Sequence, residues 1–265
     1  MASSDLGPTH DRTVDVAVFS DDDTLMRAEA EHVAALARAA IAARGRFLLA
    51  LSGGSTPRRL YGLLSRPPFL EGIDWSRVHV FWGDERCVPP GHPESNYRMA
   101  RESLLDRVPI PEENIFRIHG EDEPNRAAEA YEQVLRRAFG RVEGRPDRTF
   151  DQVLLGMGDD GHTASLFPGT PPLTEGRRWV MAQYVEPLPV PWRITLTPVV
   201  LNAAADVTFL VAGASKAPRL REVLEGGQRD VALPAQLIRP KQGALHWMVD
   251  AAAAASLSRT PRTTP

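Results

Sequence analysis

The chain of 265 residues lacks the features that mark several classes of protein. Its single cysteine, Cys87, excludes an internal disulfide and favours a reducing compartment, so we expect a cytoplasmic protein. No apolar run approaches the roughly 20 residues of a membrane span, and the polar N-terminus has no apolar core typical of a secretory signal. The net charge of −3 indicates neither nucleic acid nor an anionic membrane as a partner.

The composition is that of an ordinary globular protein. Hydrophobic residues make up 43% of the chain and charged residues 25%, which suits a full hydrophobic core. No internal repeat and no long linker divides the sequence. We therefore expect a single α/β domain over residues 1–265, with flexible tails at 1–12 and 256–265.

Short apolar runs alternate with helical patterns along the chain. The apolar runs predict strands at 14–19, 47–51, 78–82, 115–118, 153–155, 179–182, 193–196, 207–211 and 245–249. Helical spacing predicts helices after Asp23, after Pro57, from about Ser95, over 125–139 and over 251–257. This alternation predicts an α/β fold with a doubly wound, mostly parallel sheet and helices on both faces.

Four of the predicted strands end in glycine and polar residues. Since the carboxyl ends of parallel strands open on one edge of a sheet, where ligands bind, the segments that follow them are expected to share a cleft. These segments are Ser52-Gly53-Gly54, Gly83-Asp84-Glu85-Arg86, Gly156-Met157-Gly158 and Ala212-Gly213 with Ser215-Lys216. No His or Cys cluster with metal-ligand spacing occurs among them, so no metal is expected.

The segment after the second strand has the composition of an anion-binding loop. Gly53, Gly54, Ser55 and Thr56 precede Pro57, which suits the first position of a helix, with Ser55 or Thr56 as the cap. Glycines and hydroxyls before a helix leave backbone N–H groups free for a phosphate. The alternative is a tight turn that only caps the helix.

Charged residues follow two other strands. Arg86 and Lys216 are candidate ligand contacts because of this position, although both residue types are usually surface charges. Asp84 and Glu85 either face the ligand or pair with Arg86.

The stretch from Asp151 to Gly169 organises the chain. Its apolar strand breaks at glycines, passes Asp159 and Asp160, and reaches His162. The spacing matches G-x-G-x-x-G, but two carboxylates would repel a dinucleotide pyrophosphate. We interpret the stretch as a catalytic loop in which an Asp and a His lie two residues apart, with a helix starting at Ala164.

At these motifs the sequence resembles the 6-phosphogluconolactonases. The resemblance runs from about Phe47 to Ile238, and its most specific part is Asp160-Gly161-His162-Thr163-Ala164-Ser165-Leu166-Phe167-Pro168. It implies hydrolysis of 6-phospho-D-glucono-1,5-lactone in the oxidative pentose phosphate pathway. It also implies the fold shared with glucosamine-6-phosphate deaminase and ribose-5-phosphate isomerase.

Two alternatives fit the same resemblance less well. Related deaminases place a glutamate shortly after the histidine and an aromatic residue where this chain has Arg86. Here Ser165 to Pro168 contains no carboxylate. A sugar-phosphate-sensing regulator would usually bring a helix-turn-helix, for which the residues before Phe47 supply only one helix.

The implied reaction assigns roles to the candidate residues. Water needs a base that titrates near neutral pH, and His162 is the candidate, kept basic by the dipole of the expected helix. Asp160 orients the ring or the water, and Arg86 or a loop N–H stabilises the oxyanion. The phosphate is assigned to the loop Gly53–Thr56 with Arg193 and Lys216. No step requires a metal or organic cofactor.

Overall fold

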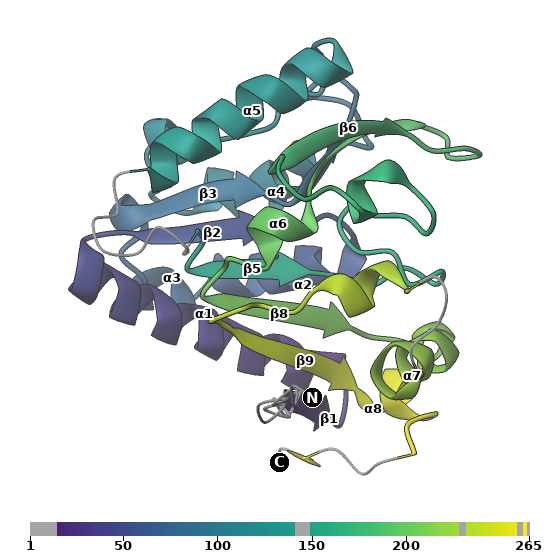
Figure 1. The fold of residues 1–265 in the computed structure, drawn as a ribbon. Coiled ribbons are helices and arrows are strands. Elements are labelled where there is room, and N and C mark those ends of the chain that lie inside the picture. Colours follow the sequence, from purple (N-terminus) through teal and green to yellow (C-terminus); the bar gives the residue numbers. More distant parts are fainter. Residues whose placement is uncertain (1–14, 141–148, 228–231, 259–261, 264–265) are drawn as a thin grey trace, which may run out of the picture.

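The predicted alternation of strands and helices is present in the computed structural model shown in Figure 1, which describes residues 15–140, 149–227, 232–258 and 262–263. The predicted tail 1–12 lies outside the described residues, as do 259–261 and 264–265 of the tail 256–265. No helix among the described residues is long and apolar enough to cross a membrane.

A parallel sheet of seven strands forms the centre, in the order β10-β1-β9-β8-β5-β2-β3. The arrows of β3, β5, β8 and β9 in Figure 1 point the same way, so the carboxyl ends of these strands share one edge. Central strands such as β2 and β8 are buried along their whole length, as their continuous apolar runs predict. The strands are β1 (Asp15–Phe19), β2 (Phe47–Leu51), β3 (Val78–Trp82), β5 (Gln152–Leu155), β8 (Asp206–Val211), β9 (Ala244–Asp250) and β10 (Arg262–Thr263).

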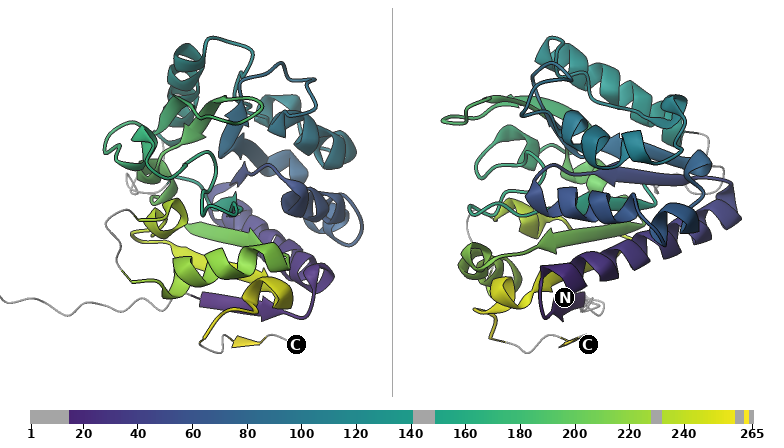
Figure 2. Two further views of the ribbon diagram at one scale, coloured as in Figure 1. Left: turned by 90° about the vertical axis from the view of Figure 1, so that its right-hand side faces the viewer. Right: turned by 180° about the vertical axis from the view of Figure 1, so that it is seen from behind.

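Helices flank this sheet on both faces, which confirms the predicted fold class (Figure 2). Helix α1 packs with α2 and α3 on one face and α4 extends this layer, whereas α5 lies on the other side. The α-helices are α1 (Asp22–Arg44), α2 (Ser55–Leu64), α3 (Phe69–Gly72), α4 (Asn96–Ser103), α5 (Pro124–Phe139), α6 (Pro198–Leu201), α7 (Ala217–Glu225) and α8 (Ala251–Ala254). Short 3-10 helices occupy Trp75–Arg77, Leu105–Arg107, Glu112–Asn114, Pro171–Leu173, Ala214–Lys216 and Pro234–Leu237.

A second sheet, which the sequence did not predict, lies over the carboxyl-terminal edge. It is antiparallel, in the order β4 (Asp84–Arg86), β7 (Trp192–Leu196) and β6 (Val180–Tyr184). The Asp-Glu-Arg segment was expected to be a loop after β3. It instead forms strand β4, which pairs with β7. A hydrogen bond from Leu196 N–H to the Gly83 carbonyl extends this pairing by one residue. The strand predicted at 115–118 is wrong: only one bridge, Val80 with Ile115, forms there.

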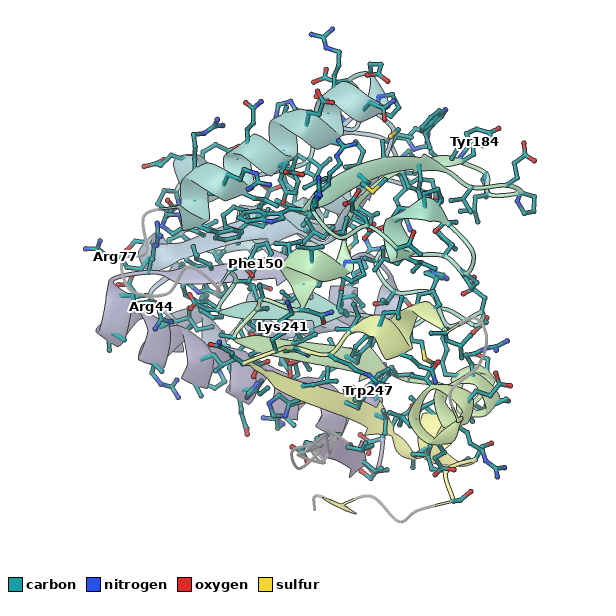
Figure 3. The ribbon with its side chains drawn as sticks, in the orientation of Figure 1. Arg44, Arg77, Phe150, Tyr184, Lys241 and Trp247 are labelled. Carbon is teal, nitrogen blue, oxygen red and sulfur yellow. The ribbon has the colours of Figure 1, made fainter. Side chains whose placement is uncertain are left out.

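The hydrophobic core lies between the large sheet and its helices. Phe150 and Trp247, labelled in Figure 3, are 0% and 2% exposed, and each stacks or packs edge-on against further aromatic rings. Tyr184 at the end of β6 instead projects into solvent. The core holds the parallel strands rigidly, so the loops at their carboxyl ends have a fixed support.

Candidate active site

The loops after β2, β3, β5 and β8 meet in one cavity at the carboxyl edge of the large sheet, as predicted. Its volume is about 280 Å³. The residues that line it are Ser52, Gly53, Gly54, Ser55, Thr56, Pro57, Asp84, Arg86, Asn96, Gly156, Met157, Gly158, His162, Ala164, Leu210, Val211, Ala212 and Lys216. The cavity therefore combines one imidazole, two cations, one carboxylate and a glycine-rich loop.

The glycine-rich loop opens helix α2 at the cavity. The N-cap residue is Gly54, with φ of 108°, which has no side chain to cap the helix. Ser55 and Thr56 lie inside the first turn, so the prediction that one of them is the cap was wrong. The first N–H groups of a helix have no intrahelical partner, and no side chain caps these. They are available to an anion.

Asn96 shapes the same wall and was not among the predicted site residues. Its amide occupies the space that a Cβ on Gly53 would need, so only glycine fits at position 53. Asn96 Nδ2 donates to the backbone carbonyl of Asp84 at 3.0 Å and to its carboxylate at 3.2 Å. The α2 loop and the Asp84 strand are thereby held at a fixed separation.

His162 lines the cavity and forms a hydrogen-bonded pair with Asp160. The distance from His162 Nδ1 to Asp160 Oδ1 is 2.5 Å, and the same oxygen accepts from the His162 backbone N–H at 3.0 Å. The imidazole lies on the Phe167 ring, with 4.4 Å between centroids. Two contacts therefore fix the orientation of the imidazole.

This pairing determines which ring nitrogen is basic. Burial opposes ionisation of Asp160, but the hydrogen bonds from His162 outweigh it and lower the pKa of the Asp160 carboxyl to about 2. An ionised carboxylate only accepts hydrogen bonds, so Nδ1 of the imidazole must carry the proton. In neutral His162 the lone pair is then on Nε2, which no described residue contacts through a hydrogen bond.

The helix expected at Ala164 is absent, so the proposed effect of its dipole on His162 is wrong. Residues 163–167 form turns, with Ala164 at φ of 48° and a bridge between Thr163 and Leu166. Chain direction reverses here because Leu166 N–H bonds back to the Thr163 carbonyl at 2.8 Å.

The small sheet holds this loop through Ser165. The hydroxyl of Ser165 donates to Asp84 Oδ2 at 2.6 Å, its N–H donates to Thr195 Oγ1 at 3.2 Å, and Gln183 Nε2 donates to its carbonyl. These partners come from β4, β7 and β6. The antiparallel sheet therefore takes over the positioning that a helix was expected to provide.

Gly158 makes room for the His162 ring, and we expect Gly158→Ala to lower kcat by about tenfold. A Cβ at this position would overlap with the imidazole and would lie 2.8 Å from Asp160 Oδ1, so the pair must move. Steady-state kinetics would measure the loss. Gly176→Ala is the control because a Cβ there meets nothing within 4 Å, and equal activity in both variants would contradict the close fit.

Arg86 and Lys216 both reach the cavity, as predicted. Arg86 Nη1 donates to the Glu94 carbonyl at 2.6 Å, while its buried Nε has no partner among the described residues. Lys216 Nζ lies 2.7 Å from Asp159 Oδ1. Asp159 is therefore the ion-pair partner of the lysine, a role that sequence reasoning missed.

Glu85 and Arg193 do not line the cavity, although both were predicted to contact substrate. Glu85 is 2% exposed, and its carboxylate accepts from the N–H groups of Arg86, Asn96 and Tyr97 and from the Ser95 hydroxyl. It thus ties β4 to the start of α4. Arg193 lies opposite Arg86 in the β4–β7 pairing, and burial, followed by the nearby Arg86 charge, lowers the pKa of its guanidinium.

Burial raises the pKa of Glu85 from 4.5 to about 7, against the opposing effect of its backbone hydrogen bonds. The folded state therefore binds this proton more tightly than the unfolded chain. We expect the free energy of unfolding to fall as the pH rises from about 4.5 through about 7, with Glu85 contributing up to about 1.4 kcal/mol per pH unit. Urea unfolding across this range should show a steeper slope for the wild type than for Glu85→Gln.

Gln has the same shape as Glu, but its N–H₂ group would face the N–H and hydroxyl groups that donate to the Glu85 carboxylate. Glu85→Gln is therefore also expected to be less stable than the wild type by about 1–3 kcal/mol at pH 8. Exposed Glu113 supplies the control, since Glu113→Gln should leave both slope and stability unchanged. A slope equal to that of the wild type in Glu85→Gln would assign the titration to another group.

Comparisons with known proteins agree with the geometry. The sequence profile of a family described as glucosamine-6-phosphate isomerases/6-phosphogluconolactonase matches residues 20–247. The chain is 44% identical over 244 residues to a 6-phosphogluconolactonase of Nostoc sp., covering 92% of this chain and 98% of the relative. A 6-phosphogluconolactonase of Synechocystis sp. is 46% identical over 219 residues, covering 82% and 88%.

Solved structures show the same relationship. The 6-phosphogluconolactonase from Trypanosoma cruzi aligns with a TM-score of 0.81 at 30% identity, covering 93% of this chain and 98% of that one. A monomeric glucosamine-6-phosphate deaminase aligns with a TM-score of 0.75 at 20% identity, covering 91% and 99%. At that identity the deaminase shows a shared fold alone.

Proposed function

Because the chain belongs to the glucosamine-6-phosphate isomerase/6-phosphogluconolactonase family, we propose that it hydrolyses 6-phospho-D-glucono-1,5-lactone to 6-phospho-D-gluconate in the oxidative pentose phosphate pathway. The proposal rests on one feature of the cavity: a basic imidazole nitrogen and an anion-binding helix start face the same space. The single thiol, Cys87, suits a reducing compartment such as the cytoplasm.

His162 acts as the general base in this reaction. Its Nε2 takes a proton from water, which attacks C1 of the lactone, while the Asp160 carboxylate holds Nδ1–H and stabilises the imidazolium that forms. A δ-lactone is an activated ester, so deprotonated water suffices as nucleophile. The imidazolium then returns the proton to the departing ring oxygen, which leaves the open-chain acid and restores the enzyme.

Arg86 stabilises the oxyanion that forms on C1. Its side chain lines the cavity, and its Nε has no hydrogen-bond partner among the described residues, so the guanidinium retains donor capacity. One preorganised donor to an oxyanion is typically worth about 3 kcal/mol in the transition state. Hydrogen bonds from Nη1 to Glu94 keep the guanidinium in place.

The 6-phosphate binds at the start of α2. The phosphate oxygens accept hydrogen bonds from the backbone N–H groups of Ser55 and Thr56 and from the Lys216 ammonium. No side chain caps the start of α2, so the backbone N–H groups of the loop Gly53–Thr56 are accessible. Arg193 adds positive potential from behind Arg86 without lining the cavity.

A deaminase-like reaction on glucosamine 6-phosphate is the competing proposal within the fold. Opening the sugar ring and moving a proton between C2 and C1 takes an additional acid–base group. The segment Ser165–Pro168 offers no carboxylate, and the Ser165 hydroxyl is engaged by Asp84. The cavity therefore favours the simpler hydrolysis.

One experiment separates the two reactions. Purified protein is supplied with 6-phosphogluconolactone in the presence of EDTA, and separately with glucosamine 6-phosphate, while acid and ammonia release are followed. We expect rapid acid release above the spontaneous rate, insensitive to the chelator, and no ammonia. Ammonia release at a comparable rate would overturn the proposed function, and loss of hydrolysis in EDTA would overturn the metal-free reaction.

A further inference from the structure

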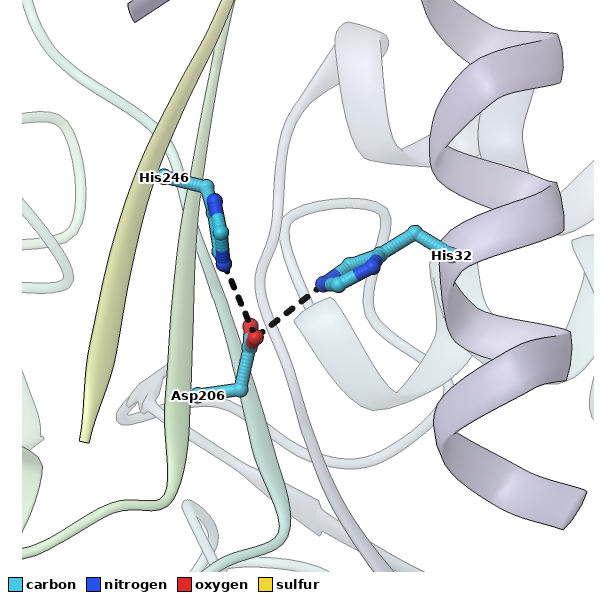
Figure 4. A group of neighbouring side chains, drawn as sticks. All are labelled: His32, Asp206 and His246. Carbon is cyan, nitrogen blue, oxygen red and sulfur yellow. Dashed lines mark hydrogen bonds and ion pairs between the residues drawn. The ribbon is translucent and has the colours of Figure 1, made fainter. Parts of the chain in front are cut away.

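A second cluster of polar side chains lies away from the active site. It consists of His32 on α1, Asp206 at the first position of β8 and His246 on β9, and we call it the His-Asp-His cluster (Figure 4). The active-site cavity touches β8 at Leu210 and Val211, at the other end of the strand. Leu210 is four positions along the strand from Asp206, which corresponds to a separation of roughly 13 Å.

Both imidazoles of the His-Asp-His cluster point at one carboxylate oxygen. Asp206 Oδ2 lies 3.0 Å from His32 Nε2 and 3.2 Å from His246 Nε2. The three potential ligand atoms all lie within 4.8 Å of one another. Ligands about 2.0–2.1 Å from a tetrahedral metal lie roughly 3.4 Å apart, so small rotations of the two rings would close a coordination shell.

Other residues orient the ligands from behind. His246 Nδ1 lies 3.3 Å from Asp15 Oδ2, and Asp206 Oδ1 accepts from the Thr208 hydroxyl at 3.1 Å. A carboxylate behind a histidine fixes the ring tautomer so that the opposite nitrogen faces the metal, an arrangement common in zinc proteins. His246 Nδ1 and Asp206 Oδ1 are thus engaged by other residues. The Nε2 atoms of both histidines and Asp206 Oδ2 are the atoms that converge.

We propose that the His-Asp-His cluster binds one divalent transition-metal ion, with zinc as the best match and water as the fourth ligand. Two imidazoles with one carboxylate suit zinc and its neighbours, whereas magnesium and calcium prefer oxygen ligands alone. The side chains of His32 and His246 are 25% and 24% exposed, which gives the ion a path from solvent. The bound ion would connect α1 to β8 and β9, so its role is structural and independent of lactone hydrolysis.

Cobalt(II) provides a direct test on the full-length protein, because its visible absorption reports coordination by nitrogen ligands in a four-coordinate site. The protein is titrated with cobalt and then with zinc as competitor. The titration is repeated in His162→Ala to remove the active-site imidazole. We expect one equivalent of zinc to bind in both proteins, with a visible cobalt spectrum that zinc abolishes and a higher Tm with zinc.

Substitution of the proposed ligands makes the test specific. His32→Gln and His246→Gln are each expected to weaken zinc binding by at least about 10- to 100-fold, the scale seen when a metal site loses a supporting group. His119→Gln, on an exposed side chain outside the cluster, should bind as the wild type does. Lactone hydrolysis should remain unchanged in His32→Gln.

Absence of saturable zinc binding below about 100 μM would overturn the site, as would equal binding by the wild type and both ligand variants. The wild-type cobalt spectrum needs no substitution, so a variant that fails to fold leaves the inference testable. Neither outcome bears on the proposed hydrolysis.

Discussion

Replacing His162 with alanine is expected to lower kcat for lactone hydrolysis by about 100- to 10,000-fold, the range that general-base catalysis contributes. The reason is geometric: the imidazole is the cavity's single histidine, and Asp160 leaves its Nε2 free. The rate must be measured above spontaneous hydrolysis of the lactone. The Tm should stay close to that of the wild type, because the His162 ring is partly exposed and its aromatic contact is with Phe167.

His119→Ala provides the matched control, since its imidazole is exposed and outside the cavity. It should keep wild-type kinetics. A His162→Ala enzyme that retains more than about a tenth of wild-type kcat would mean that another group activates water.

Removing the 6-phosphate from the substrate is expected to lower kcat/KM by at least about 100-fold. Two charge-assisted hydrogen bonds to the phosphate, worth about 1.5–3 kcal/mol each, account for this loss. Lys216→Ala should in turn lower kcat/KM for the phosphorylated lactone by about 10- to 100-fold. Remote binding energy often supports kcat as well as KM, so both constants are expected to change.

Lys216→Ala and removal of the 6-phosphate together form a double-mutant-type cycle that tests whether Lys216 contacts the phosphate. If Lys216 contacts it, Lys216→Ala should have almost no effect on unphosphorylated gluconolactone. Lys241→Ala, which alters an exposed lysine outside the cavity, controls for net charge. Equal losses on both lactones would place Lys216 against the sugar ring or in a structural role.

The sequence predicted most of the large sheet because central strands such as β2 and β8 are buried on both faces and read as continuous apolar runs. It did not predict β10, which pairs with β1 from within the stretch 256–265 that was expected to be a flexible tail. The cleft followed from one topological rule, that parallel strands present their carboxyl ends together. His162, Arg86 and Lys216 could therefore be singled out from their places after strand ends, and all three line the cavity. Asp160 reaches the site through its hydrogen bond to His162.

The small antiparallel sheet could not be predicted, because three residues at 84–86 carry no periodic signal and their partner lies more than 100 positions away. The contacts that fix the catalytic loop could not be predicted either, because they join residues far apart in the sequence, such as Ser165 and Asp84. The expected helix at Ala164 failed because these tertiary hydrogen bonds outweigh local propensity. Glu85 was misplaced for the same reason: the backbone N–H groups that it accepts from belong to a later helix.

No sequence motif indicates the His-Asp-His cluster. His32 and Asp206 are 174 positions apart, whereas metal motifs are recognised by ligands spaced a few residues from one another. Its ligands come together only because β8 and β9 are neighbours and α1 packs on β9.

The pH dependence of kcat/KM tests the central claim, that His162 is the base. One other group near the site competes for this assignment, since the pKa of Glu85 is raised to about 7 by burial. Spontaneous hydrolysis is subtracted at each pH for the wild type and for Glu85→Gln. Because imidazolium cannot accept a proton, activity should rise with pH to a plateau, with the same limb in both proteins. Disappearance of that limb in Glu85→Gln would contradict the account and make Glu85 the titrating group.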